Sequence, residues 1–170
     1  GTRFCGGTRE PGPLTAAGRD LLAGMADLGM SLDLSHMDEL AVRQALDDYP
    51  GPLLVSHANA AALLENYSGN RMLSDGVIRN IIQRDGIIGV MPDLPFLKNG
   101  WKPADGRAGL TLESAFVPQI DYICQLAGNA QHVGIGTDFD GGFGVESAPA
   151  DVDSIADLQK LEGILLTRGY

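Results

Sequence analysis

The sequence predicts an α/β protein with a parallel sheet, and the best fit is about half of a β/α barrel with four strand-helix units. Short apolar runs alternate four times with segments of helical periodicity, and the connections are mostly short. No glycine-rich phosphate loop follows the first run, which disfavours a nucleotide-binding sheet. Three runs stop at His36, His57 and Asp138, where barrels place functional side chains at the carboxyl ends of their strands.

The first elements follow from local patterns. Residues 1–12 are rich in Gly, Arg and Pro without periodicity, which predicts a loop. Thr15 is a suitable N-cap for a helix with one apolar face, and Gly29 suits its end. The apolar run at 31–35 then predicts the first strand.

The next two units repeat this order. The pattern predicts a helix over 38–48, ended by the Tyr-Pro-Gly that precedes a strand at 53–56. A third helix begins near Ser74 and has a continuous apolar face, and the wholly apolar run 86–90 predicts the third strand.

The last unit contains a long loop. Residues 91–110 are punctuated by Pro and Gly, and loops of this length in compact domains are usually functional. A helix over 111–126 follows, with Pro118 as a kink or short break. The fourth strand is expected at 133–137 and the last helix at 155–168.

Size and composition limit the domain organisation and the partners. A closed barrel needs twice as many strands and about 250 residues, so we expect this 170-residue chain to be part of a single barrel domain of a longer protein. A net charge of −10 and a pI near 4.5 argue against nucleic acid as a partner. No apolar stretch approaches the roughly 20 residues of a membrane span. Cys5 and Cys124 lie far apart and indicate neither a zinc knuckle nor a disulfide framework.

His36 and His57 are the strongest candidates for metal ligands. Each follows a serine at the end of a predicted strand, and the two strands are consecutive. Neighbouring parallel strands lie about 4.8 Å apart, so the two imidazoles can converge on one zinc ion. The alternative for either histidine is a buried ring bonded to a backbone carbonyl, but the matched placement favours ligation.

Other side chains are weaker candidates. Asp138, directly after the fourth strand, suits a proton acceptor or a metal neighbour, and the alternative is a solvated Asx turn. Arg71 could clamp a substrate carboxylate, although most loop arginines are solvated. Asp33 could hold a histidine by its second ring nitrogen, and His132, at the opposite end of its strand, is expected to be structural.

These segments together resemble the renal (membrane) dipeptidase family, the zinc dipeptidases of peptidase family M19. The resemblance runs from about Leu14 to Tyr170 and rests on 28–36 (LGMSLDLSH), 55–59 (VSHAN) and 134–141 (GIGTDFDG), in the family's order. It implies a β/α barrel of the metal-dependent hydrolase type that cleaves dipeptides, some with a D-residue on the carboxyl side, with a metal-bridged water.

The resemblance also implies roles for individual residues. His36 and His57 would ligate one of two Zn²⁺ ions, Asp138 would manage the proton passed to the leaving amine, and Arg71 would bind the dipeptide's terminal carboxylate. The family's other ligands, a His-X-Asp and a bridging glutamate, have no counterpart here and precede Gly1 in family order. We therefore expect residues 1–170 to be the C-terminal part of the barrel domain and to be inactive alone.

Two alternatives stay open at this stage. One is a catalytically silent half-barrel or relative that acts as a binding or structural piece. The other is another two-metal amidohydrolase, which a lysine at a strand end would favour, and no lysine here has that position. A homodimer is one assembly that the resemblance allows. The cellular compartment stays open. A cytoplasmic, bacterial-type location is favoured, and a secreted or membrane-anchored full-length protein is the alternative.

Overall fold

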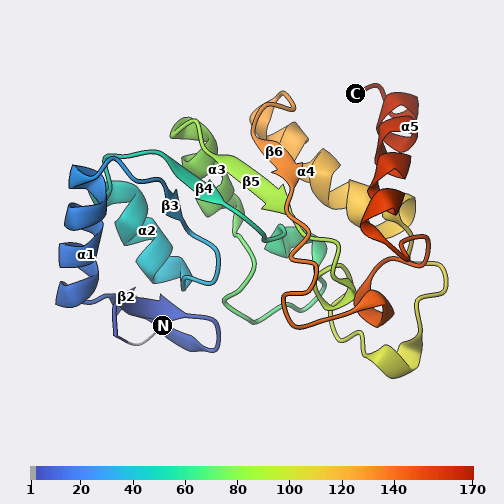
Figure 1. The fold of residues 1–170 in the computed structure, drawn as a ribbon, viewed down its shortest axis with the longest axis horizontal. Coiled ribbons are helices and arrows are strands. Elements are labelled where there is room, and N and C mark those ends of the chain that lie inside the picture. The colour runs from blue at the N-terminus through green and yellow to red at the C-terminus, as the bar shows by residue number, and fades with distance from the viewer. Residues whose placement is uncertain (1–2) are drawn as a thin grey trace.

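The computed structural model describes residues 3–170 and contains a hairpin followed by four alternating strand-helix units (Figure 1). The hairpin pairs β1 (Cys5–Gly7) with β2 (Glu10–Leu14). The sheet strands are β3 (Leu32–Asp33), β4 (Leu53–Val55), β5 (Ile87–Val90) and β6 (Val133–Ile135). The helices are α1 (Ala16–Asp27), α2 (Glu39–Asp48), α3 (Asp75–Gln83), α4 (Val117–Ala127) and α5 (Lys160–Thr167).

The four-stranded sheet is parallel throughout and has the order β3-β4-β5-β6. Its two faces differ in burial. Ile88 and Val90 are fully buried on the face that α3 and α4 cover, whereas Ile87 on the opposite face is 52% exposed. A sheet with one covered face and one open face is the architecture of half a barrel, which confirms the predicted fold class.

The helix starts agree with the capping signals. The hydroxyl of Thr15 accepts a hydrogen bond from the N–H of Gly18, and that of Ser74 accepts one from Val77. The predicted helix over 111–126 begins as a π-turn at Leu112–Phe116 before α4, with Pro118 in the first turn of α4. The last helix likewise begins as a 3₁₀ turn, Ile155–Gln159, ahead of α5.

The loop predicted for residues 1–12 is wrong for the described part of that segment, which forms the β1–β2 hairpin; residues 1–2 lie outside the described residues. Gly6 allows the two strands to approach, because a Cβ there would lie 2.2 Å from the carbonyl oxygen of Gly12. The hairpin is tied to the barrel by a bridge between Gly7 and Met37 and by the N–H of Asp38, which donates to Gly6. Local patterns miss these contacts because their partners are distant in sequence.

The long loop after β5 is anchored at its start. The side-chain amide of Asn59, which is fully buried, accepts from the N–H of Met91 and donates to the carbonyls of Met91 and Phe96. Two short 3₁₀ turns, Leu94–Phe96 and Pro103–Asp105, interrupt the loop. The first residues beyond β5 are therefore fixed relative to the end of β4.

Close packing of backbone sets the spacing of the strand ends. A Cβ at Gly89 would lie 2.1 Å from the carbonyl oxygen of Ser56, and one at Gly136 would lie 1.9 Å from the same atom. Glycine at both positions lets the end of β4 lie against the backbone of β5 and β6. His57 and Asp138 are brought to the same rim by this contact. Within residues 3–170, none of the helices combines the length and apolar character that a membrane span requires.

Candidate metal centre

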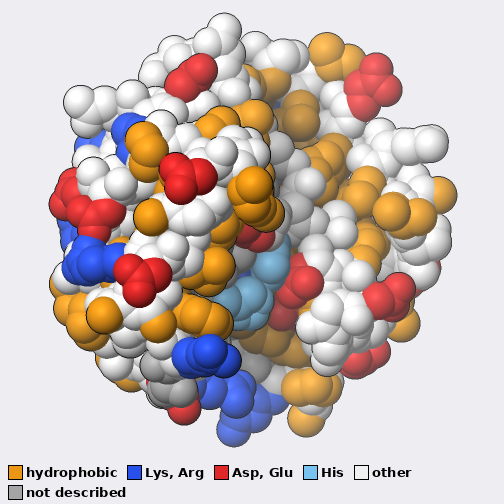
Figure 2. Space-filling model, turned by 60° about the vertical axis from the view of Figure 1, so that its left-hand side comes forward, with side chains coloured by type: hydrophobic (Ala, Val, Ile, Leu, Met, Phe, Trp, Pro, Cys, Tyr) orange, Lys and Arg blue, Asp and Glu red, His pale blue; other side chains and the backbone are white. Residues whose placement is uncertain are grey.

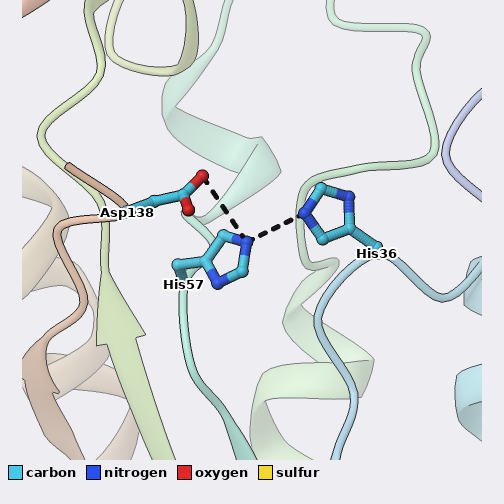
Figure 3. A group of neighbouring side chains, drawn as sticks. All are labelled: His36, His57 and Asp138. Atoms are coloured by element: carbon cyan, nitrogen blue, oxygen red, sulfur yellow. Dashed lines mark hydrogen bonds and ion pairs between the residues drawn. The ribbon is translucent and has the colours of Figure 1, made fainter. Parts of the chain in front are cut away.

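The structure brings the predicted site residues together at the carboxyl ends of the strands. His36 follows β3, His57 follows β4 and Asp138 follows β6, and their side chains point toward one another (Figure 3). The Nε2 atoms of His36 and His57 lie 2.9 Å apart, and Asp138 Oδ2 lies 3.7 Å from His57 Nε2. One ligand-type atom from each residue lies within 4.8 Å of the other two. Figure 2 shows the histidines in a hollow with acidic side chains at its edge.

The ring of His57 is oriented by Ser56 and Asp33. The Ser56 hydroxyl donates to Asp33 Oδ2 at 2.6 Å and lies 2.7 Å from His57 Nδ1. Because the hydroxyl proton points to the carboxylate, the serine oxygen accepts the proton of Nδ1, and the lone pair of Nε2 is directed at Nε2 of His36. Asp33 thus acts on the second ring nitrogen, as predicted, but through Ser56.

Hydrogen bonds also set the charge of Asp33. Burial would raise its pKa, yet the hydrogen bonds donated by the Ser56 hydroxyl and by the N–H groups of Ser56 and Ser35 hold the pKa below its usual value. An ionised Asp33 is the stronger acceptor for the serine proton, which reinforces the Nδ1–H tautomer of His57.

His36 is held by the hairpin. Thr8 Oγ1 lies 3.0 Å from His36 Nδ1, and the N–H of Thr8 donates to the carbonyl of His36. His36 has φ +66°, in the left-handed region that non-glycine residues rarely adopt. The cost of such a conformation is of order 1–3 kcal/mol, and contacts of this kind must offset it. Thr8 was not identified from the sequence.

Both imidazoles are biased toward the neutral form. Burial, followed by the positive charge of Arg71, lowers the pKa of His36 and of His57, while Asp138 acts in the opposite direction. A neutral imidazole with its Nε2 lone pair directed into the hollow is the form of histidine that binds metal ions.

Arg71 is buried at the same site, so it is not a solvated loop arginine. It is 7% exposed, its Nη2 donates to the carbonyl of His57 at 2.6 Å, and its guanidinium lies 5.8 Å from the centre of the Phe96 ring. Among residues 3–170, Nη1 has no hydrogen-bond partner. A buried guanidinium with a free N–H group is suited to binding a carboxylate.

Asp138 lies in a loop that turns sharply. Its φ is +52°, its carbonyl accepts from the N–H of Gly141, and its side chain is about a quarter exposed. A cavity of about 430 Å³ lies beside this loop. The loop residues that line it include Thr137, Phe139 and Phe143. The carboxylate of Asp138 thus lies beside His57, while its neighbours Thr137 and Phe139 line a space of ligand size.

His132 and Asp93 lie outside this cluster. His132 has the expected structural contact, with Nδ1 at 3.1 Å from the carbonyl oxygen of Gly86. Asp93, just beyond β5, is a buried carboxylate that the sequence did not single out. Its position in a Pro-rich loop gave no signal of burial.

The residues present fit a divalent transition metal. Two neutral imidazoles and a carboxylate are ligand types that Zn²⁺ prefers, and a hydroxyl holds the second nitrogen of each ring, as in known metal sites. Fold and site thus define the class of protein: a β/α-barrel protein with a candidate metal centre at the carboxyl rim of its parallel strands.

The family within that class follows from comparison with known proteins. The sequence model of the membrane dipeptidase family, peptidase family M19, matches residues 3–170, so the chain belongs to this family. This confirms the resemblance and implies a metal cofactor, because the family consists of metallopeptidases.

Individual relatives match most of this chain but only part of their own length. An uncharacterized protein in the pqqA 5′ region of Klebsiella pneumoniae is 36% identical over 96% of this chain and 56% of its own length. A dipeptidase of Claviceps purpurea named tcpJ is 30% identical over 92% of this chain and 33% of its own length. The chain thus spans between a third and somewhat more than half of these relatives.

Solved structures show the same partial coverage. The metallo peptidase dipeptidase AC, of family M19, superimposes with a TM-score of 0.81 at 28% identity, over 98% of this chain and 48% of that one. A metallo peptidase of Rhodobacter sphaeroides, liganded with a phosphinate mimic of L-Ala-D-Ala, gives a TM-score of 0.76 at 28% identity, over 98% and 46%. The chain corresponds to about half of each.

Proposed function

We propose that the complete protein containing this chain is a zinc-dependent dipeptidase, and that residues 1–170 are the C-terminal part of its single barrel domain. One observation carries the proposal: two imidazole Nε2 atoms 2.9 Å apart, with Asp138 beside them and a hydroxyl group at each Nδ1. Family membership adds the substrate class. A D-residue on the carboxyl side is the expected preference, since the Rhodobacter sphaeroides relative carries a mimic of L-Ala-D-Ala.

The residues of this chain have distinct roles in this proposal. His36 and His57 would hold one ion of a zinc pair. Bound zinc would lower the pKa of water and polarise the peptide carbonyl. The free Nη1 of Arg71 binds the terminal carboxylate of the dipeptide. Asp138 Oδ2 accepts a proton and passes it to the leaving amine.

The remaining ligands come from outside this chain. A catalytic zinc has three protein ligands and an exchangeable position, and His36 and His57 are too few for a zinc pair. From the resemblance we expect the missing ligands upstream, so these residues alone are expected to bind zinc weakly and to be inactive. The presence of these ligands in the upstream sequence would distinguish a dipeptidase from a catalytically silent relative, which would lack them.

Metal content and activity of the complete protein test the proposal. We expect His57→Ala and His36→Asn to lower the zinc content and to reduce the hydrolysis of Ala-D-Ala at least about a thousandfold. Asn is chosen at position 36 because it tolerates the left-handed backbone there. His132→Asn is the matched control, since its contact lies at the other end of β6. Unchanged zinc content in both site variants would refute the assignment.

A further inference from the structure

Asp93 is a buried carboxylate that the proposed mechanism does not use. It lies three residues beyond β5, and β5 lies between the strands that precede His57 and Asp138. The residue is 6% exposed, and no hydrogen bond reaches its side chain from residues 3–170. Oδ1 is buried without a partner. An unpartnered buried carboxylate is costly, so a native protein that keeps one needs a reason for it.

The surroundings of Asp93 make this cost larger. Burial, followed by the negative charges of Asp138 and Glu146, raises the pKa of Asp93 to about 7. Asp138 and Glu146 belong to the loop that follows β6, and other residues of that loop line the cavity of about 430 Å³. The site is therefore arranged to favour an incoming positive charge.

The backbone around Asp93 is fixed before any ligand arrives. The Asn59 amide holds Met91 and Phe96 on either side of it, and the carbonyl of Asp93 accepts from the N–H of Phe96 at 2.8 Å. A rigid carboxylate loses little conformational entropy on binding, which is how specificity groups gain affinity.

We propose that Asp93 is a specificity-determining residue that binds an ammonium group of the substrate. The ammonium is either the α-amino group of the dipeptide or the side chain of a lysine-type residue. This inference rests on the proposed dipeptidase function.

Two ratios measured on the zinc-loaded complete protein separate these sources. The first is kcat/KM for Lys-D-Ala over norleucyl-D-Ala, and the second is kcat/KM for Ala-D-Ala over N-formyl-Ala-D-Ala. In Asp93→Asn we expect one of them to fall at least about tenfold, because a buried charge pair is lost. A fall of the first assigns the side-chain ammonium, and a fall of the second assigns the α-amino group. If neither ratio changes, the proposal is overturned.

Glu162→Gln is the charge-matched control, because Glu162 is exposed on α5 and its charge is not among those that act on Asp93. It should leave both ratios within about twofold, which excludes a general effect of net charge. If the wild-type protein cleaves no dipeptide, the proposed function fails, and dissociation constants of the same intact compounds, measured by calorimetry, give the ratios. A loss of lysine or α-amine preference in Asp93→Asn would then support the ammonium site independently of catalysis.

Discussion

The two sides of the candidate site differ in how their polar groups are satisfied. On the histidine side, at the ends of β3 and β4, each imidazole has a hydroxyl partner, and Asp33 accepts hydrogen bonds from Ser35 and Ser56. On the acidic side, beyond β5 and β6, Asp93 has no side-chain partner among the described residues. Hydrogen bonds hold the two imidazoles in fixed orientations on the histidine side. On the acidic side, the carboxylate of Asp93 has no partner within the described part of the chain that would neutralise its charge.

The contact between the two sides should be the most sensitive point. Gly136→Ala places a Cβ 1.9 Å from the carbonyl oxygen of Ser56, so we expect the free energy of unfolding to fall by about 3 kcal/mol. Gly134→Ala, two residues earlier and within β6, is the matched control, because the nearest atom to a Cβ there is 3.7 Å away. Urea unfolding of the complete protein measures both. Equal stability of the two variants would mean that this contact does not set the spacing.

On the acidic side, Asp93 should make the free energy of unfolding depend on pH. Because the pKa of Asp93 is raised to about 7, the folded state retains a proton that the unfolded state releases near pH 4. The free energy of unfolding should therefore fall as the pH rises from about 4 to 7, by about 3 kcal/mol.

Asp93→Asn should remove this part of the pH dependence. Chemical denaturation at pH 5 and at pH 8, in the presence of a chelator, compares the variant with the wild type. Parallel curves for the two proteins would show that Asp93 gains a neutralising partner in the complete protein.

The histidine side should respond in metal affinity. Asp33→Asn weakens the acceptor for the Ser56 proton and so loosens the tautomer of His57. We expect a loss of about 10- to 100-fold in zinc affinity, as for other groups that hold metal ligands. Competition with a chromophoric chelator measures it. Unchanged affinity would show that the Ser56 hydroxyl orients the ring without the carboxylate.

The smallest expected effect belongs to Thr8. Thr8→Val keeps the shape of the side chain but removes the hydrogen bond to His36 Nδ1, and we expect zinc affinity to fall about fivefold. Thr8→Ser should restore most of it, because the hydroxyl is kept. If valine and serine at this position give the same affinity, the hairpin acts on His36 through its backbone contacts alone.

The sequence predicts the parallel sheet, the capped helices and the convergence of His36 and His57, because each rests on a local pattern that repeats at strand ends. The contact between Thr8 and His36 could not be predicted, since 28 residues separate them and the hairpin strands are rich in Gly and Pro. The burial of Asp93 depends on how the anchored loop folds over the strand ends, and residue type alone predicts an exposed aspartate.

The left-handed backbone at His36 limits how this centre can be copied into another protein. An engineer who grafts the imidazole onto an ordinary strand end would aim the ring in a different direction, because the φ angle and not the rotamer alone sets its path. The graft would need the stretch 5–14 as well, since that stretch contacts the strained residue. The smallest transferable unit is therefore His36 together with the hairpin.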